Sequence, residues 1–232
     1  MYRILKKRYL NEAKNVIEMV IDAPLVARKC LAGQFIIFRI DEFGERVPLT
    51  IADFDRDAGT VTIIFQIVGK TTSLLNELNA GESIVDFVGP LGSASHLEGY
   101  RNVAVIGGGL GTAIAYPQAK KLAQLGSCVD IIVGFRNKDL IILEDEIKAA
   151  ATRAFIATDD GSNGNKGFVT NVLKQLLDEG AQYDLVIAIG PLVMMKAVCN
   201  LTKEYGIKTM VSMNPIMIDG TGMCGGCRLT VG

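Results

Sequence analysis

The first 97 residues alternate short apolar runs with turn-forming residues. Runs rich in β-branched and aromatic residues, which favour strands, stand at 35–40, 60–68 and 82–90. In the second run apolar residues occupy both parities, so part of that strand is expected to be buried on two faces. The only good helical pattern is 72–78, where leucines recur three and four residues apart. Many short strands and one short helix predict a small antiparallel β-barrel of the Greek-key type.

From about residue 101 the pattern changes to strands that alternate with helices. Strands are expected at 102–109, 128–135, 154–158, 183–190 and 207–213, and helices at 112–126, 143–151, 168–180 and 191–206. Alternation at this spacing is typical of βαβ units, which build a parallel sheet with right-handed crossovers. We therefore expect a Rossmann-like α/β domain after the barrel, with the junction within 93–100.

Composition excludes several classes of protein. With 49% hydrophobic and 21% charged residues, the chain has enough apolar mass to fold, which a disordered chain lacks. Lys and Arg number 24 against 25 Asp and Glu, so no basic excess indicates nucleic-acid binding. No apolar run approaches the ~18–20 residues of a membrane span. The N-terminus lacks the apolar stretch of a secretory signal, and we expect a cytoplasmic protein.

The five cysteines are too scattered, and odd in number, to predict a disulfide framework. Cys30, Cys128 and Cys199 stand among apolar residues and are expected to be small buried side chains. Cys224 and Cys227 differ, because they form a C-x2-C pair among glycines.

A glycine-rich turn follows the first strand of the α/β half. It comprises Gly107, Gly108, Gly109, Leu110, Gly111 and Thr112. Glycines allow backbone N–H groups to approach a pyrophosphate, and the following helix adds its positive N-terminus. The strict G-x-G-x-x-G pattern is not met, and a purely structural turn is the alternative. After the second strand stands Arg136, where an acidic residue would favour NAD; an Arg there accepts the 2′-phosphate of NADP or is simply solvent-exposed.

Two motifs in the first half are candidates for holding phosphate. The segment GKTT at 69–72 is like the end of a Walker A loop, but position 64 is Ile instead of Gly, which excludes an ATPase. A phosphate site at a helix N-terminus and an ordinary cap by Thr71 or Thr72 both remain open. The segment RVPLT at 46–50 combines an Arg with an extended backbone that can lie along a flat ligand.

The C-terminal end carries the sharpest pattern. Asp219, Cys224 and Cys227 have the spacing of a plant-type ferredoxin loop, with Asp in the first place. A zinc site would need a second pair of ligands at a distance. The sequence has no second cysteine pair, and its one histidine is His96. The pair does not follow the first strand, which excludes a thioredoxin-type motif. A fourth ligand is missing and the sequence runs only five residues past Cys227, so we expect a truncated cluster segment.

Taken together, these motifs resemble the ferredoxin–NADP reductase superfamily, in the branch that holds the electron-transfer subunit of dihydroorotate dehydrogenase. The motifs are, in order, RVPLT, VGKTTSLL, GGGLGTAIAYP, AIGP and DGTGMCGGC. The C-terminal run is most similar to the small (alpha) subunits of NADH-dependent reduced ferredoxin:NADP oxidoreductases, also known as sulfide dehydrogenase subunits. The resemblance implies an FAD-binding barrel at 1–97, an NAD(P)-binding α/β domain at 98–218 and the start of a 2Fe–2S segment at 219–232.

The resemblance also implies roles for single residues. In the flavin motif Arg46, Pro48, Leu49 and Thr50, the Arg would contact the pyrophosphate and the Thr the isoalloxazine ring. Ile64, Gln66 and Val68 match the strand that lines the ribityl chain and adenine side. Gly69, Lys70, Thr71 and Thr72 match the flavin pyrophosphate turn, and Gly107 to Thr112 the turn for the nicotinamide nucleotide. Gly190 and Pro191 match a Cys-Gly-Pro turn in which Ile189 replaces the Cys. Asp219, Cys224 and Cys227 match three of four ligands of a 2Fe–2S cluster.

The implied function is electron transfer between NAD(P)H, FAD and a 2Fe–2S cluster, toward or from a larger subunit. A nicotinamide gives up a hydride and a cluster accepts one electron, so a flavin that can do both stands between them. No catalytic acid or base is implied. The implied partner is a large flavoprotein or iron–sulfur subunit that resembles the glutamate synthase small subunit, or ferredoxin. The family implies NADH, whereas Arg136 indicates NADP.

Two other hypotheses stay open. The first is a stand-alone ferredoxin or flavin reductase without a cluster, and the second is a non-enzymatic nucleotide-binding module with a metal-binding tail.

Overall fold

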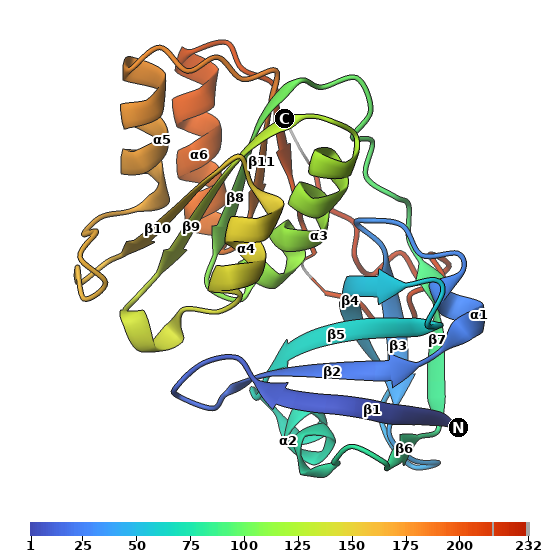
Figure 1. Ribbon diagram of the computed structural model, residues 1–232. Coiled ribbons are helices and arrows are strands. Elements are labelled where there is room, and N and C mark those ends of the chain that lie inside the picture. The colour runs from blue at the N-terminus through green and yellow to red at the C-terminus, as the bar shows by residue number, and fades with distance from the viewer. Residues whose placement is uncertain (215, 231–232) are drawn as a thin grey trace. The chain divides into compact units, whose positions relative to one another are not determined.

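A computed structural model describes residues 1–214 and 216–230, which form two compact units (Figure 1). The first unit comprises residues 1–10, 14–95 and the described residues from Met213 onward. The second unit comprises residues 11–13 and 96–212. The C-terminal segment therefore returns to the first unit after the second is complete. None of the helices in the described part of the chain has both the length and the apolar character needed to span a bilayer.

The described residues of the first unit form a nearly closed antiparallel barrel of seven strands, in the order β6-β1-β2-β5-β4-β3-β7. The strands are β1 (Tyr2–Tyr9), β2 (Val16–Asp22), β3 (Phe35–Arg39), β4 (Val47–Asp55), β5 (Thr60–Gln66), β6 (Ser83–Ile84) and β7 (Asp86–Leu91). Two short helices, α1 (Pro24–Ala27) and α2 (Lys70–Glu77), complete this unit. Because β2 lies beside β5 instead of β3, the strands β2 to β5 form a Greek key, as predicted.

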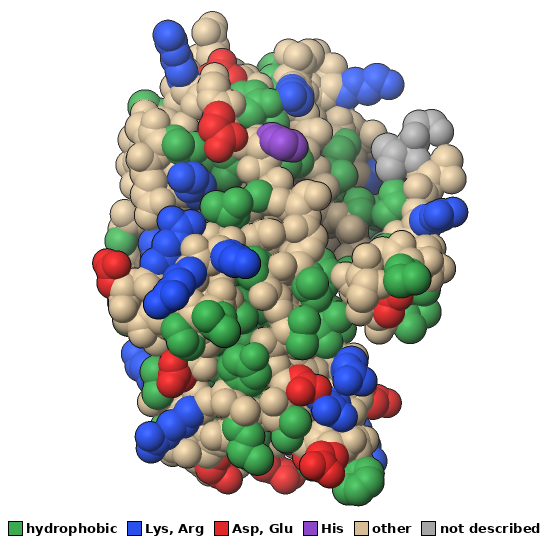
Figure 2. All heavy atoms as spheres, turned by 90° about the vertical axis from the view of Figure 1, so that its right-hand side faces the viewer, with side chains coloured by type: hydrophobic (Ala, Val, Ile, Leu, Met, Phe, Trp, Pro, Cys, Tyr) green, Lys and Arg blue, Asp and Glu red, His purple; other side chains and the backbone are tan. Residues whose placement is uncertain are grey.

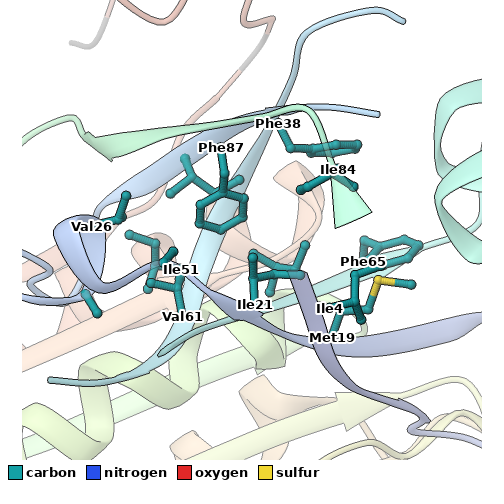
Figure 3. Close-up of a cluster of buried hydrophobic side chains, with 14 of the residues drawn as sticks. Ile4, Met19, Ile21, Val26, Phe38, Ile51, Val61, Phe65, Ile84 and Phe87 are labelled. Atoms are coloured by element: carbon teal, nitrogen blue, oxygen red, sulfur yellow. The ribbon is translucent and has the colours of Figure 1, made fainter. Parts of the chain in front are cut away.

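The barrel encloses a core of aliphatic and aromatic side chains (Figure 3). Phe38, Phe65 and Phe87 are its largest members, each at most 1% exposed. In β5, Ile63 and Phe65 point into this core, while Ile64 faces outward and is still only 7% exposed. The predicted burial of this strand on both faces is thus confirmed.

The second unit is a parallel sheet whose described strands have the order β10-β9-β8-β11-β12. The strands are β8 (Asn102–Gly108), β9 (Cys128–Phe135), β10 (Arg153–Thr158), β11 (Leu185–Ile189) and β12 (Thr209–Val211). The helices are α3 (Gly111–Gln124), α4 (Glu144–Ala150), α5 (Val169–Asp178) and α6 (Leu192–Glu204), with a short 3-10 turn, η1, at Lys138–Leu140. The predicted Rossmann-like architecture is confirmed.

The strand order of this sheet reverses between β8 and β11. From β8 the chain proceeds to β9 and β10 on one side, and then crosses to β11 and β12 on the other. In open parallel sheets, ligands bind outside the carboxyl ends of the strands at such a reversal. The turns that follow β8 and β11 therefore lie at the place where a nucleotide is expected.

The structure corrects two details of the sequence interpretation. Helix α2 begins at Lys70, two residues before the predicted start, with Gly69 as its N-cap. Cys128 is exposed, so its predicted burial is wrong; it is the first residue of β9, where the amino edge of the sheet opens to solvent. Cys30 is buried in the barrel core as expected, and Cys199 is half-buried.

Candidate functional site

The two phosphate-holding motifs of the barrel lie close together. The hydroxyl of Thr71, in the first turn of α2, donates a hydrogen bond to Oε2 of Glu45 at 3.0 Å. Glu45 directly precedes Arg46, so this bond joins the start of the RVPLT motif to the N-terminus of α2. Residues far apart in sequence thus form one neighbourhood, which contains the Arg46 guanidinium, the N-terminus of α2 and the negative charge of Glu45.

The turn before α2 is fixed by Thr72, which is 8% exposed. Its hydroxyl accepts the N–H groups of Val68 and Gly69 at 3.0 and 3.1 Å, and donates to the carbonyl of Gly69 at 3.0 Å. Thr72 thus stands inside the helix, and neither it nor Thr71 is the N-cap residue. A Cβ on Gly69 would meet nothing within 4 Å, so open space lies beside the backbone at this helix N-terminus.

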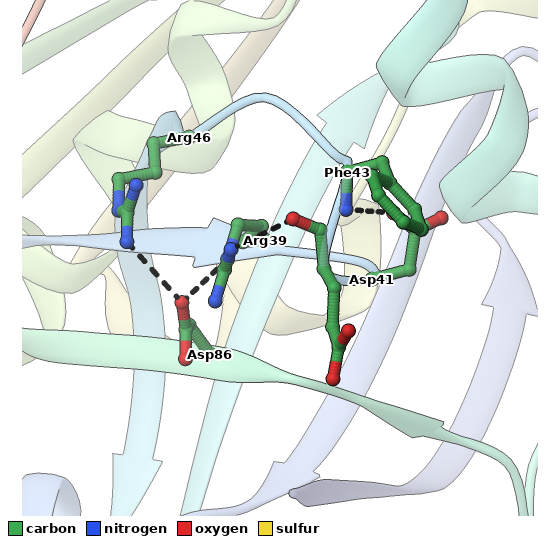
Figure 4. A network of polar contacts seen from close by, with 6 residues as sticks. Arg39, Asp41, Phe43, Arg46 and Asp86 are labelled. Atoms are coloured by element: carbon green, nitrogen blue, oxygen red, sulfur yellow. Dashed lines mark hydrogen bonds and ion pairs between the residues drawn. The ribbon is translucent and has the colours of Figure 1, made fainter.

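The side chain of Arg46 is 60% exposed, and its guanidinium points toward the carboxylate of Asp86 (Figure 4). Its Nη2 lies 3.7 Å from Oδ2 of Asp86, while Nε of Arg39 donates to the same oxygen at 2.6 Å. Arg39 therefore holds Asp86 closely, and Arg46 keeps donors available for a further anion.

The remaining residues predicted for the flavin lie on β4, on β5 and in the turn after it. Pro48 and Thr50 pair with Ile37 and Phe35 of β3, on the outer face of the barrel. Leu49 has the opposite parity and packs against the core.

On β5 the residues predicted for the flavin also face outward. Ile64 and Gln66 have the parity opposite to the core residues Ile63 and Phe65. Ile64 adjoins Thr50, because both flank the pair Ile51–Ile63. Val68, beyond the strand, is 78% exposed. The outer face of β4 and β5 thus brings the predicted ring-contacting and ribityl-lining residues together.

Among the glycines at the end of β8 and just after it, some are packed against other atoms and one borders open space. A Cβ on Gly107 would stand 2.9 Å from Cα of Thr112, and one on Gly111 would stand 2.4 Å from the carbonyl oxygen of Ile189. These two glycines are required by packing alone. Gly109 has a φ of +54°, and a Cβ there would meet nothing within 4 Å. Gly109 is therefore the position in this turn beside which space is open.

The turns after β8 and β11 touch each other at the strand-order reversal. A Cβ on Gly190 would lie 3.1 Å from Cα of Gly108, and one on Gly108 would lie 2.9 Å from Cδ of Pro191. Met194 fills the space beside both glycines, with its Sδ 2.5 Å from the Cβ position of Gly108. Met194 is not part of any motif in the sequence, and its place three residues after Pro191 is the one signal that points to it.

Two polar side chains lie near this reversal. Thr112 is fully buried, and its hydroxyl, beside Gly107, has no hydrogen-bond partner among the described residues. A buried hydroxyl without a partner is uncommon and costs free energy, which fits a place that a ligand or water completes. Arg136 is exposed just beyond the carboxyl end of β9, whose Gly134 carbonyl accepts the N–H of Gly109 at 2.9 Å.

Asp219 and Cys224 form a closed turn in the C-terminal segment. The carboxylate of Asp219 accepts the N–H of Thr221 at 3.0 Å and that of Cys224 at 3.3 Å. The bond from the Thr221 backbone lowers the pKa of Asp219, which keeps it ionised. Sγ of Cys224 accepts the N–H of Gly226 at 3.4 Å.

The residue types in this turn are suitable for an iron–sulfur cluster, because cysteine thiolates that accept N–H···S bonds are typical of cluster ligands. The described residues nevertheless contain no group of three His, Cys, Asp or Glu side chains placed to hold a metal ion, and Cys227 does not join Asp219 and Cys224 in one.

A polar network that the sequence did not reveal stands at the opposite, amino edge of the parallel sheet. Arg153 binds the carboxylate of Asp130 through two hydrogen bonds of 2.9 and 2.6 Å, and Tyr183 donates to the same carboxylate at 2.6 Å. Burial and the bond to Asp130 raise the pKa of Tyr183. The network links β9, β10 and the residues before β11, so its role is to hold the sheet together.

Comparison with known proteins finds relatives along nearly the whole chain, although no family model matches it. A protein of Clostridium beijerinckii, described only as an uncharacterized protein in the adh 3' region, is 50% identical over all of this chain and 80% of its own length. The dihydroorotate dehydrogenase B (NAD(+)) electron transfer subunit homolog of Thermotoga maritima is 43% identical over 94% of this chain and 77% of its own. The electron transfer subunit from Fusobacterium nucleatum is 36% identical over 93% and 84%.

Solved structures also match this chain over nearly its whole length. A chain from a structure of NADH-dependent reduced ferredoxin-NADP oxidoreductase, reported for flavin-based electron bifurcation, has a TM-score of 0.92 and 41% identity, and covers all of this chain and 82% of its own. A ferredoxin reductase of carbazole 1,9a-dioxygenase, at 19% identity and a TM-score of 0.74 over 90% of this chain and 67% of its own, shares the fold.

Proposed function

Because this chain belongs to the family of the dihydroorotate dehydrogenase B electron transfer subunits, we propose that it is an NAD(P)H-dependent flavoprotein oxidoreductase subunit. It would pass electrons between a nicotinamide nucleotide, FAD and a 2Fe–2S cluster, toward or from a larger partner subunit. The observation that carries this proposal is the likeness along the whole chain to the oxidoreductase structure at 41% identity.

The barrel supplies the residues for FAD. Arg46 and the N-terminus of α2 at Lys70 would hold the pyrophosphate, with Thr71 and Glu45 fixing their spacing. Two phosphate-holding elements suit a dinucleotide better than a mononucleotide, which favours FAD over FMN. When bound, a flavin accepts a hydride and releases electrons singly, so the protein itself need only bind, orient and shield.

The second unit supplies the residues for the nicotinamide nucleotide. Gly109 would admit the pyrophosphate, the N-terminus of α3 would stabilise its charge, and Gly190 and Pro191 would line the other side of the crevice. Arg136 would lie near the adenine ribose, where its contact with a 2′-phosphate decides between NADH and NADPH.

The C-terminal segment would hold the cluster and contact the partner. Asp219, Cys224 and Cys227 are the proposed ligands, with a fourth that none of the described residues supplies in this arrangement. The same segment exposes Ile216 (58%), Ile218 (64%) and Met223 (89%). Apolar side chains this exposed are typical of an interaction surface, and a large flavoprotein or iron–sulfur subunit is the proposed occupant.

A visible absorption spectrum of the protein as purified tests the proposal, since flavin and 2Fe–2S bands differ. Acid extraction and chromatography of the flavin should give FAD, and anaerobic addition of NADH or NADPH should bleach it. A protein without flavin colour would overturn the proposal and favour a nucleotide-binding module. Flavin without cluster bands, after reconstitution with iron and sulfide, would favour a stand-alone reductase.

A further inference from the structure

The backbone of the C-terminal segment lies directly against the outer face of β3 at Gly220. A Cβ on Gly220 would stand 2.3 Å from Cδ1 of Ile37 and 3.3 Å from Cε2 of Phe35. Packed atoms do not approach so closely, so a side chain at this position would require Cδ1 of Ile37 or the turn itself to move. Gly220 also has a φ of +72°, in the left-handed region that glycine adopts without strain.

The two contacted side chains form what we call the β3 surface, consisting of Phe35 and Ile37. Their neighbours Ile36 and Phe38 point into the barrel core, so the β3 surface faces outward. The ring of Phe35 is held between two glycines, since a Cβ on Gly92 would lie 2.8 Å from its Cε1. Ile37 is only 5% exposed. The β3 surface is therefore a fixed base and not a pair of loose side chains.

The β3 surface adjoins the residues proposed to contact the flavin. Phe35 pairs with Thr50, and Ile37 pairs with Pro48, across the β3–β4 ladder. Side chains directly opposite each other in an antiparallel pair lie on one face, with Cβ atoms about 4.5–5.5 Å apart. Gly220 thus stands one strand away from Pro48 and Thr50.

We propose that Gly220 is a positioning residue that fixes the candidate metal donors beside the flavin-contacting strand. Asp219 is its immediate neighbour, and the hydrogen bonds of Asp219 to Thr221 and Cys224 carry the constraint into the rest of the turn. A side chain at position 220 would lift this turn from β3 and move both donors away from β4. The contact with β3 is the evidence for this inference. The metal-binding role of the turn rests on the proposed function.

Three substitutions test it. Gly220→Ala adds both backbone strain and the overlap with Ile37. Gly222→Ala is the matched control: Gly222 has a φ of +88°, but a Cβ there would meet nothing within 4 Å, so it adds strain alone. Ile37→Val removes the overlapping Cδ1 atom and should rescue Gly220→Ala specifically.

The measurement is backbone hydrogen exchange of the flavin-loaded protein, followed by mass spectrometry on peptides that cover 216–230 and 35–39. Gly220→Ala is expected to speed exchange at least ~tenfold in both peptides, because loss of a packed contact opens both of its sides. Gly222→Ala should change only the first peptide, and by less. Adding Ile37→Val to Gly220→Ala should recover most of the protection, while Ile37→Val alone changes little.

Equal effects of Gly220→Ala and Gly222→Ala would overturn the inference, as would a failure of Ile37→Val to rescue. If Gly220→Ala does not fold, the double variant with Ile37→Val should fold; its failure, with Gly222→Ala folded, also counts against the inference. No cluster is needed for these measurements. A protein that shows the expected exchange but cannot be loaded with a cluster keeps the inference and loses the cluster part of the proposed function.

Discussion

Substituting Gly109 should separate nucleotide binding from the stability of the turn that follows β8. Gly109 and Gly126 both have left-handed backbones, with φ of +54° and +84°, and a Cβ on either would meet nothing within 4 Å. Gly126 follows the C-terminus of α3, at the end of that helix away from the turn. The pair therefore shares the same strain and differs in position relative to the proposed nucleotide.

Both Gly109→Ala and Gly126→Ala should lose about 1–2 kcal/mol of stability, the strain of a left-handed residue that carries a Cβ. In a protein of this size that lowers the melting temperature by about 2–8 °C. Only Gly109→Ala should also lose nucleotide affinity. The added methyl group would hold the phosphate away from the N–H groups at the N-terminus of α3. One hydrogen bond to a charged phosphate contributes about 1.5–3 kcal/mol, so the Kd for NAD⁺ or NADP⁺ should rise roughly ten- to hundredfold.

Isothermal titration of each variant with NAD⁺ and NADP⁺, beside calorimetric melting, gives both quantities. Gly111→Ala is the third member of the set: its Cβ would lie 2.4 Å from the carbonyl oxygen of Ile189, which is backbone and cannot rotate away. It should lose more stability than either of the other two. Equal Kd values in Gly109→Ala, Gly126→Ala and the wild type would refute the reasoning and leave the turn a structural feature only.

Three further outcomes are expected. Arg46→Ala should raise the Kd for FAD roughly tenfold or more, because a charge-assisted contact worth about 1.5–3 kcal/mol is lost; flavin retained after gel filtration measures it. Tyr183→Phe should lower the melting temperature, because Asp130 loses a 2.6 Å hydrogen bond. Since the native fold raises the pKa of Tyr183, the wild type should also lose stability as the pH rises above the ordinary tyrosine value of about 10, and that part of the loss should be missing in the variant. Burial raises the pKa of Cys30 to about 11, so a thiol reagent at pH 8 should modify Cys128 in the native protein and leave Cys30 unmodified until unfolding, as peptide mass analysis would report.

Sequence patterns predicted the α/β half closely because local signals there agree with the fold. The run 128–135 has the bounds of β9, since an unbroken apolar run bordered by turn residues has few alternatives. The strands of the barrel were harder to predict from the sequence. Strand β1 alternates exposed charges with few buried residues, and Ile4 alone is fully buried, so it carries little hydrophobic signal.

Residues of the candidate site could be predicted from the sequence where their arrangement depends on neighbouring residues. They could not be predicted where the arrangement depends on contacts between distant parts of the chain. The turns at 69–72 and 107–112 follow from neighbouring residues alone. Gly111 packs against Ile189, and Gly220 packs against Ile37. Both contacts involve a strand far away in the sequence. The burial of Cys128 was mispredicted for the same reason: its apolar neighbours do not reveal that the amino edge of the sheet is open there.

The return of the C-terminal segment to the first unit bears on the order in which a ribosome releases the parts. Strand β3 leaves the ribosome early, whereas Gly220 follows only after the whole second unit has been made. At 5–20 residues per second that interval lasts roughly ten to forty seconds. During this time the nascent barrel has Phe35 and Ile37 uncovered, and a chaperone or a second nascent chain can bind there. The β3 surface is therefore covered only after the whole second unit has been synthesised.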